Sequence, residues 1–240
     1  MKLDQPLQEA TLLKRYKRFL ADVQLPDGSM KTLHCPNTGS MKNCQPSGAR
    51  IWYSDSGNPN RKYPCTWQIV EVDKRHLVGI NTGLANSLVA EAISSSQIAQ
   101  LPAPNALRRE VKYGEQGSRI DLLLDYAQGS EEEKCYVEVK NVSLGMPQGL
   151  GVFPDAVTTR GQKHLQELIS VCHHGHRAVL FFCVQHTGID VVEPADDIDP
   201  DYGKLLRQAA EKGVEILAYR ARFDLAESSI SLTDEIPVRL

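Results

Sequence analysis

Two carboxylates and one amine are close in sequence in the second half of this chain. Asp121 ends the segment Ser118-Arg-Ile-Asp, and Glu138-Val-Lys140 follows after an acidic turn. If both segments are β-strands, Glu138 and Lys140 share a face, because residues two apart point to the same side. Val139 then points into the core, and Asp121 comes alongside from the preceding strand. We expect Asp121, Glu138 and Lys140 to gather in one small volume.

Such a set suits hydrolysis of a phosphodiester bond. Asp121 and Glu138 would hold Mg²⁺, or Mn²⁺ in its place, through hard oxygen ligands. The ion would stabilise charge that develops on phosphorus, and Lys140 would orient or deprotonate the attacking water. Glu110 is a further candidate, either to complete the metal shell or in a surface salt bridge. A cross-strand salt-bridge network on a solvated face remains the alternative for the whole set.

A basic helix is predicted after these strands, at 159–172, from its amphipathic spacing. Arg160, Lys163 and Glu167 fall on the face opposite its apolar stripe. Arg160 and Lys163 lie near the helix N-terminus, where backbone N–H groups also favour phosphate, and we predict that both contact DNA. A solvated face with a Lys163–Glu167 pair is the alternative.

The strands and helices around this set predict a C-terminal α/β domain over residues 83–240. Strands that alternate with helices favour a mixed, partly parallel sheet. The expected strands are 119–124, 135–142, 179–184 and 214–219, the first two joined across the acidic turn 129–133, and the expected helices are 159–172 and 202–212.

Residues 1–82 predict a small N-terminal β-barrel of the OB type, since short strands alternate there with long loops. Asp27-Gly28 is a strong hairpin signal, and Phe19 and Trp67 are the expected core aromatics. A helix at 84–93 and a linker at 94–105 should follow. The expected strands are 19–25, 30–35, 51–53, 66–72 and 76–81.

The charge distribution suits a DNA-contacting front half. Residues 1–80 contain 12 Lys and Arg against 7 Asp and Glu, whereas residues 81–240 contain 15 against 23. OB barrels bind nucleic acid with a basic groove and aromatic platforms. The predicted DNA contacts of this domain are Arg15, Lys17, Arg18, Arg61 and Lys62.

Composition excludes several other classes of protein. The 240 residues have a net charge of −3, and no apolar run approaches the roughly 20 residues that span a bilayer. The first residues lack the apolar stretch of a signal peptide, so we expect a cytoplasmic protein, associated with the nucleoid if it binds DNA. None of the six cysteines forms a C-x-x-C pair, which argues for free thiols over a structural zinc site.

Several blocks of sequence carry a family resemblance over essentially the whole chain. They are Arg15–Val23, Leu33–Met41, Glu110–Gly114, Ser118–Asp121, Val137–Val142 and Phe153–Leu165. Together they resemble the bacterial sugar fermentation stimulation protein A family. The resemblance implies an OB-like domain followed by a domain similar to the PD-(D/E)-x-K nuclease superfamily. It places that motif on Asp121, Glu138 and Lys140 with Glu110 as the helix acid, although Ile120 replaces the motif's proline.

The leading hypothesis is a DNA-binding protein, largely without sequence preference, with a Mg²⁺-dependent nuclease-type site. The sequence leaves open whether the chain is a metal-dependent DNA endonuclease or exonuclease. The alternative is a non-catalytic DNA-binding transcriptional regulator of sugar utilisation genes, for maltose in particular, which the resemblance also implies. RNA is an alternative partner, no membrane is expected, and the oligomeric state is open, a homodimer included.

Overall fold

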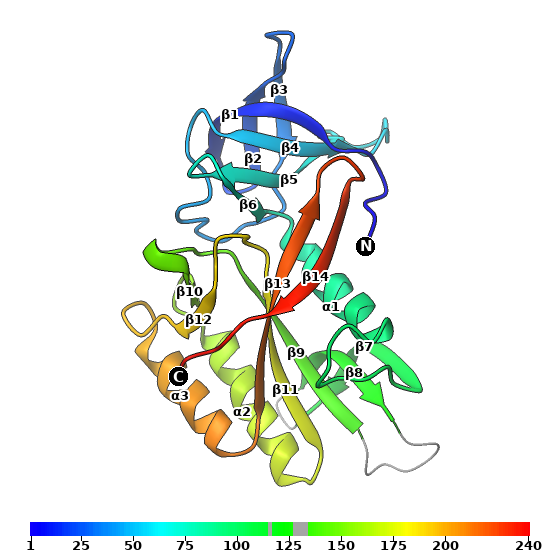
Figure 1. The fold of residues 1–240 in the computed structure, drawn as a ribbon, viewed down its shortest axis with the longest axis vertical. Coiled ribbons are helices and arrows are strands. Elements are labelled where there is room, and N and C mark those ends of the chain that lie inside the picture. Colours follow the sequence, from blue (N-terminus) through cyan, green and yellow to red (C-terminus); the bar gives the residue numbers. More distant parts are fainter. Residues whose placement is uncertain (115–116, 127–133) are drawn as a thin grey trace.

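The computed structural model describes residues 1–114, 117–126 and 134–240, which form two domains (Figure 1). The predicted acidic turn at 129–133 lies outside the described residues. No helix among these residues is long and apolar enough to cross a membrane. All six cysteines are free, as predicted, and all but Cys172 are buried.

The N-terminal domain is a closed OB-type barrel, as predicted. β3 pairs antiparallel with β2 and parallel with β5 through His34 and Thr66, and this last pairing closes the barrel. The strands are β1 (Gln8–Tyr16), β2 (Leu20–Gln24), β3 (Met30–His34), β4 (Arg50–Asp55), β5 (Cys65–Val72) and β6 (His76–Gly79).

β1 was absent from the strands expected from sequence. Only Ala10 and Leu12 of β1 are buried, and the pairing of β1 with β2 shifts register between Leu12 and Lys14. The alternation of apolar and polar residues that would indicate a strand is therefore short and interrupted. The expected core position of Phe19 is wrong, because this side chain is 43% exposed in the β1–β2 turn. Trp67 is fully buried, as expected.

The C-terminal domain contains the predicted mixed sheet, in the order β14-β13-β11-β9-β8-β7. β11 runs parallel to β9 and β13, and the remaining neighbours are antiparallel. The strands are β7 (Ala106–Tyr113), β8 (Ser118–Asp125), β9 (Lys134–Val142), β11 (Arg177–Val184), β13 (Glu215–Asp224) and β14 (Ser229–Glu235), with a separate parallel pair of β10 (Leu150–Phe153) and β12 (Val191–Pro194).

Helices cover both faces of this sheet. α1 (Ala85–Ser94) packs on one face, and α2 (Thr159–His173) and α3 (Pro200–Glu211) pack on the other. The continuously apolar strand β11 serves both layers, because its successive side chains alternate between the two cores. The predicted linker at 94–105 is wrong, since Ile98 and Leu101 are fully buried in the α1-side core.

One carboxylate fixes the start of α2 against α3. Asp199 caps α3 by accepting from the backbone N–H of Tyr202 at 3.0 Å. It also accepts from the N–H of Thr158 and the side chain of Gln162 at the start of α2. This arrangement holds the helix that carries Arg160.

Hydrogen bonds join the two domains directly. The N–H of Gly79 in β6 donates to the carbonyl of Gln185, and the N–H of Thr187 donates to the carbonyl of Leu77. β6 thus adds a short ladder to the segment that follows β11. These contacts fix the barrel relative to the sheet.

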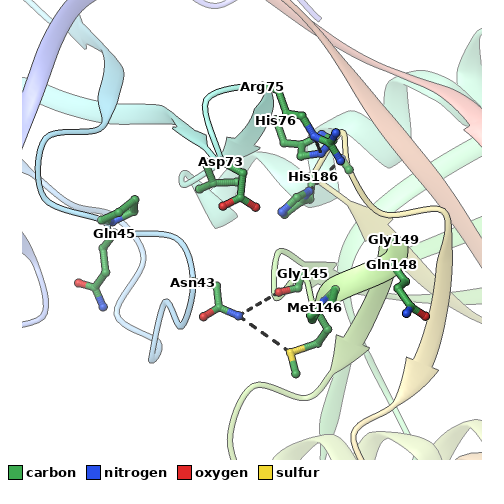
Figure 2. Close-up of a pocket in the computed structure, with 14 residues that line it drawn as sticks. Asn43, Gln45, Asp73, Arg75, His76, Gly145, Met146, Gln148, Gly149 and His186 are labelled. Carbon is green, nitrogen blue, oxygen red and sulfur yellow. Dashed lines mark hydrogen bonds between the residues drawn. The ribbon is translucent and has the colours of Figure 1, made fainter.

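A cavity of about 700 Å³ opens at this domain junction (Figure 2). The imidazoles of His76 and His186 lie on its wall with ring centroids 5.9 Å apart. His186 is 7% exposed, and burial, with the neighbouring His76, lowers the pKa of His186 to about 4. His186 is therefore neutral in the folded protein at neutral pH.

This buried imidazole predicts a loss of stability in mild acid. The unfolded chain binds a proton at His186 below its ordinary pKa of about 6.5, whereas the folded chain does so only near 4. The free energy of unfolding should therefore fall by about 3 kcal/mol as pH falls through that window. Urea unfolding of wild type and His186→Gln between pH 7 and pH 4 measures it. An unchanged slope in the variant would refute the assignment.

Candidate active site

The site lies where β8 and β9 stop pairing, just beyond the pair Leu122–Val137, and where the β7–β8 ladder lacks one pair. Arg109 pairs with Leu122 and Val111 pairs with Ile120, but Glu110 and Asp121 between them make no ladder pair. Glu110 has a left-handed φ of 53°. Left-handed backbone at a residue other than glycine is strained, and such strain is common beside active sites. Asp121 lies directly beyond the last β8–β9 pair, and its carboxylate reaches the backbone of β9 there.

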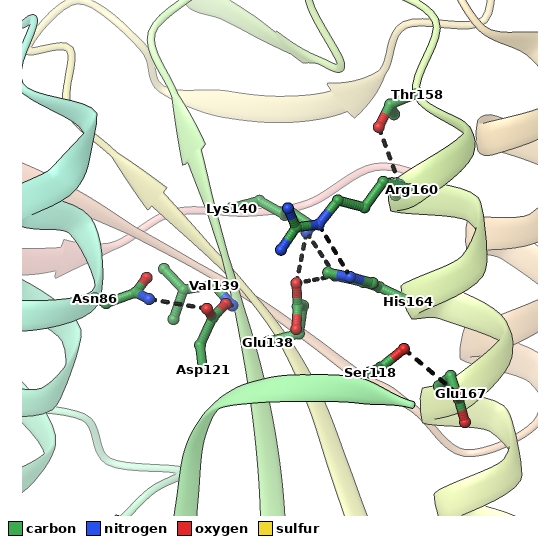
Figure 3. A network of polar contacts seen from close by, with 11 residues as sticks. Asn86, Ser118, Asp121, Glu138, Val139, Lys140, Thr158, Arg160, His164 and Glu167 are labelled. Carbon is green, nitrogen blue, oxygen red and sulfur yellow. Dashed lines mark hydrogen bonds and ion pairs between the residues drawn. The ribbon is translucent and has the colours of Figure 1, made fainter. Parts of the chain in front are cut away.

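Both oxygens of Asp121 are held by donors (Figure 3). Oδ2 accepts from the backbone N–H of Val139 at 2.8 Å, and Oδ1 accepts from the side-chain amide of Asn86 on α1 at the same distance. The carboxylate therefore bridges β9 and α1. Each oxygen keeps a second lone pair that a cation could use.

Glu138 and Lys140 share a face of β9, as predicted, and Val139 lies in the core. Glu138 is 2% exposed, and its Oε1 accepts from the Lys140 ammonium at 2.6 Å. Nδ1 of His164 on α2 contacts the same oxygen, and because an ionised carboxylate only accepts, this nitrogen donates. Oε2 of Glu138 is buried and has no hydrogen-bond partner within the part of the chain that the structure describes.

The environments of the two carboxylates shift their pKa values in opposite directions. Burial raises the pKa of Asp121, and the charge of Glu138 raises it further. Burial also opposes ionisation of Glu138, but the His164 hydrogen bond and the Lys140 charge outweigh it and lower the pKa of Glu138. The ionised form of Glu138 is thus stabilised by Lys140 and His164, whereas the ionised form of Asp121 is disfavoured by burial and by the charge of Glu138.

α2 brings one predicted basic residue to this network. Nε of Arg160 donates to Nε2 of His164 at 3.4 Å, which connects an exposed guanidinium to Glu138. Lys163 is half-buried on the same helix. The expected solvated position of Glu167 is wrong, because this residue is 3% exposed and accepts from the Ser118 hydroxyl at 3.4 Å.

Glu110 does not occupy the expected place. The sequence placed it before a strand, and the resemblance implied a helix acid, but Glu110 lies within β7 and is exposed. Its positive φ interrupts the strand opposite Asp121. The helix residue at Asp121 is Asn86, an amide donor. A catalytic role for Glu110 remains a prediction.

Two arginines predicted to contact DNA also hold a barrel loop. Arg15 is half-buried and donates from Nη2 to the carbonyls of Arg18, Asn37 and Gly39. Arg18 donates from Nε and Nη2 to the carbonyl of Thr38. These bonds fix the loop that follows β3, so both arginines have structural tasks.

The same loop reaches the second domain through a carboxylate. The Ser40 hydroxyl donates to Oδ2 of Asp155 at 2.7 Å. Asp155 precedes α2 and connects the domains. The other predicted basic contacts, Lys17, Arg61 and Lys62, are exposed in the β1–β2 and β4–β5 turns.

The two carboxylates, Asp121 and Glu138, fit a divalent cation whose other ligands are water or substrate phosphate. Among the described residues, no three His, Cys, Asp or Glu side chains form a complete metal cage. Mg²⁺ commonly binds through one or two carboxylates and keeps water or substrate phosphate as its other ligands. Asp121 and the unpartnered Oε2 of Glu138 match that smaller requirement.

Sequence reasoning assigned no role to Asn86 or His164, although both contact the candidate residues. The one local signal for His164 is its position four residues after Arg160 on a predicted helix, which places the two on one face. Asn86 gave no signal, since its contact with Asp121 depends on how α1 packs.

Comparison with known proteins identifies the family. The model described as "SfsA N-terminal OB domain" matches residues 13–80, and that described as "Sugar fermentation stimulation protein RE domain" matches residues 83–227. The chain belongs to the sugar fermentation stimulation protein family. The family models fall on the two domains of the structure, the barrel and the mixed sheet.

Similar family members cover the whole chain. A homolog from Shewanella loihica is 55% identical over 98% of both chains, and one from Teredinibacter turnerae is 56% identical over 100% of both. Both are named "Sugar fermentation stimulation protein homolog". A solved structure, "The structure of Pyrococcus Furiosus SfsA in complex with Ca2+", matches with a TM-score of 0.83 and 26% identity over 100% of both chains.

Proposed function

We propose that this protein binds DNA largely without sequence preference and hydrolyses phosphodiester bonds with Mg²⁺ at Asp121, Glu138 and Lys140. One observation carries the proposal. Two strands and two helices converge on a buried Glu138, a second carboxylate and an amine, and the second oxygen of Glu138 has no partner among the described residues. A fold needs no such cluster for stability, because buried carboxylates side by side repel each other.

Each residue has a task in this reaction. Asp121 and Glu138 would hold the cation, which when bound would stabilise negative charge on the phosphoryl group. The Lys140 ammonium donates one of its three N–H groups to Glu138, and the other two could donate to the attacking water or to a phosphate oxygen. His164 fixes the side chain of Glu138, and Arg160 places a cation where the α2 N-terminus also favours phosphate.

The Ca²⁺ complex of the Pyrococcus furiosus relative supports a divalent cation. Ca²⁺ and Mg²⁺ both select oxygen ligands, and carboxylates are the usual protein donors for either. We propose Mg²⁺ or Mn²⁺ as the working ion of this chain, held at Asp121 and Glu138.

The direct test is cleavage of plasmid, linear and single-stranded DNA by the wild-type protein. We expect cutting with Mg²⁺ or Mn²⁺ and none in EDTA. DNA affinity in EDTA should fall steeply as salt rises, because phosphate contacts release counterions. Failure to cut any substrate, with DNA binding intact, would contradict the catalytic part of the proposal.

A non-catalytic regulator of sugar utilisation genes is the second candidate. It is favoured by the ion pair between Lys140 and Glu138, which together with His164 forms a nearly self-sufficient network. In that case the network would fix α2 against β9, and added Mg²⁺ would leave DNA binding unchanged with no cutting.

A further inference from the structure

A second polar groove, of about 500 Å³, lies between the barrel and the start of α1. It follows the β3–β5 junction, where a single residue pair closes the barrel. Apart from Arg61 and the carboxylate of Asp4, its polar side chains are neutral hydrogen-bonding groups. The groove includes His34, Ser54, Arg61, Thr66, Gln68 and Asn81.

Part of the groove is pre-organised by its own hydrogen bonds. Gln68 is 7% exposed and donates to the Ser54 hydroxyl at 2.9 Å, while Asn81 donates to Gln68 at the same distance. Nδ1 of His34 is buried without a partner in the described part of the chain. Burial and the charge of Arg61 lower the pKa of His34, so its ring is neutral at neutral pH.

The groove includes residues close in sequence to one that contacts a candidate carboxylate. Asn81 lies at its edge, the turn Thr82–Leu84 follows, and Leu84 also lines the groove. Two residues later, Asn86 donates to Asp121. A short stretch of backbone therefore connects the groove to the candidate active site.

We infer that this groove binds a single-stranded segment of DNA next to the phosphate to be cleaved. Neutral amides, hydroxyls and an imidazole are the groups that recognise the edges and faces of unpaired bases. In a duplex those edges are paired, and its two phosphate backbones require a wider, more basic surface. The location of the cleaved phosphate rests on the proposed function, but strand binding in the groove does not.

Binding without metal tests the inference apart from catalysis. Fluorescence anisotropy in EDTA would compare a labelled 12-nucleotide single strand with the duplex and the RNA of the same sequence. We expect the single-stranded DNA to bind roughly tenfold more tightly than the duplex, since stacking of one base on the His34 ring would supply that much. Arg61→Glu and Ser56→Glu, at exposed positions on the groove rim, should each weaken this binding about tenfold at fixed salt.

Arg75→Glu is the matched control, because Arg75 is exposed, lines the other cavity and undergoes the same charge change. It should alter single-strand affinity less than about twofold. Equal affinity for the duplex, or equal losses in all three variants, would overturn the inference. Tighter binding of the RNA strand would overturn the assignment to DNA. If the wild-type protein shows the expected preference for single-stranded DNA but cuts no DNA, only the proposed function would be contradicted.

Discussion

Replacing Lys140 with alanine is expected to lower Mg²⁺-dependent cleavage by about 10²- to 10³-fold, the usual effect of removing one pre-organised donor. The Lys140 side chain is only 14% exposed and contacts Glu138 at 2.6 Å. Under the proposed function it acts on the reacting group, and because it is mostly buried it adds little to the surface that attracts DNA. DNA affinity in EDTA should stay within about twofold of wild type. Cleavage assays and anisotropy on the same preparations measure both.

Two controls make this result interpretable. Lys204→Ala removes an exposed lysine on α3 and should cut at the wild-type rate. Lys140→Arg keeps a positive charge beside buried Glu138, so it should fold even if the alanine variant does not, while the different donor geometry should still impair cleavage. Wild-type cleavage by a folded Lys140→Ala protein would remove the lysine from the mechanism.

The parts of the site that follow local periodicity could be predicted from sequence. Glu138 and Lys140 share a face because strand side chains alternate, and the apolar residues around them indicated a central strand. Asp121 was harder, since its position depends on pairing between strands. Its carboxylate reaches the backbone of Val139 where the pairing of β8 with β9 has ended.

The errors at Glu110 and Glu167 have physical causes that sequence patterns do not show. A positive φ at Glu110 interrupts an otherwise continuous strand, and no glycine or asparagine marks the position. Glu167 is buried where α2 packs against β8, and there it accepts a hydrogen bond from Ser118, which is far away in sequence. In both cases a tertiary contact or local strain overrides the local preference.

Long-range contacts also explain the residues that received no role. Asn86 is 35 positions from Asp121, and His164 is 26 positions from Glu138. Arg15 shows a further limit of sequence reasoning: its contact with DNA stays a prediction, and its hydrogen bonds to the carbonyls of a distant loop gave no local signal.

Mg²⁺ or Ca²⁺ at about 100 times its Kd is expected to raise the Tm of the wild-type protein by roughly 5–10 °C, because binding to the folded state alone adds about 2.7 kcal/mol. Asp121→Asn and Glu138→Gln should each abolish most of this shift, since each removes a charged oxygen ligand while keeping side-chain volume. Asp201→Asn, in the first turn of α3 and exposed, is the matched control and should keep the full shift. Thermal unfolding with EDTA, Mg²⁺ and Ca²⁺ measures all four proteins. A wild-type-sized shift in both site variants would mean that the ion binds elsewhere, and the buried carboxylate pair would then be a structural network.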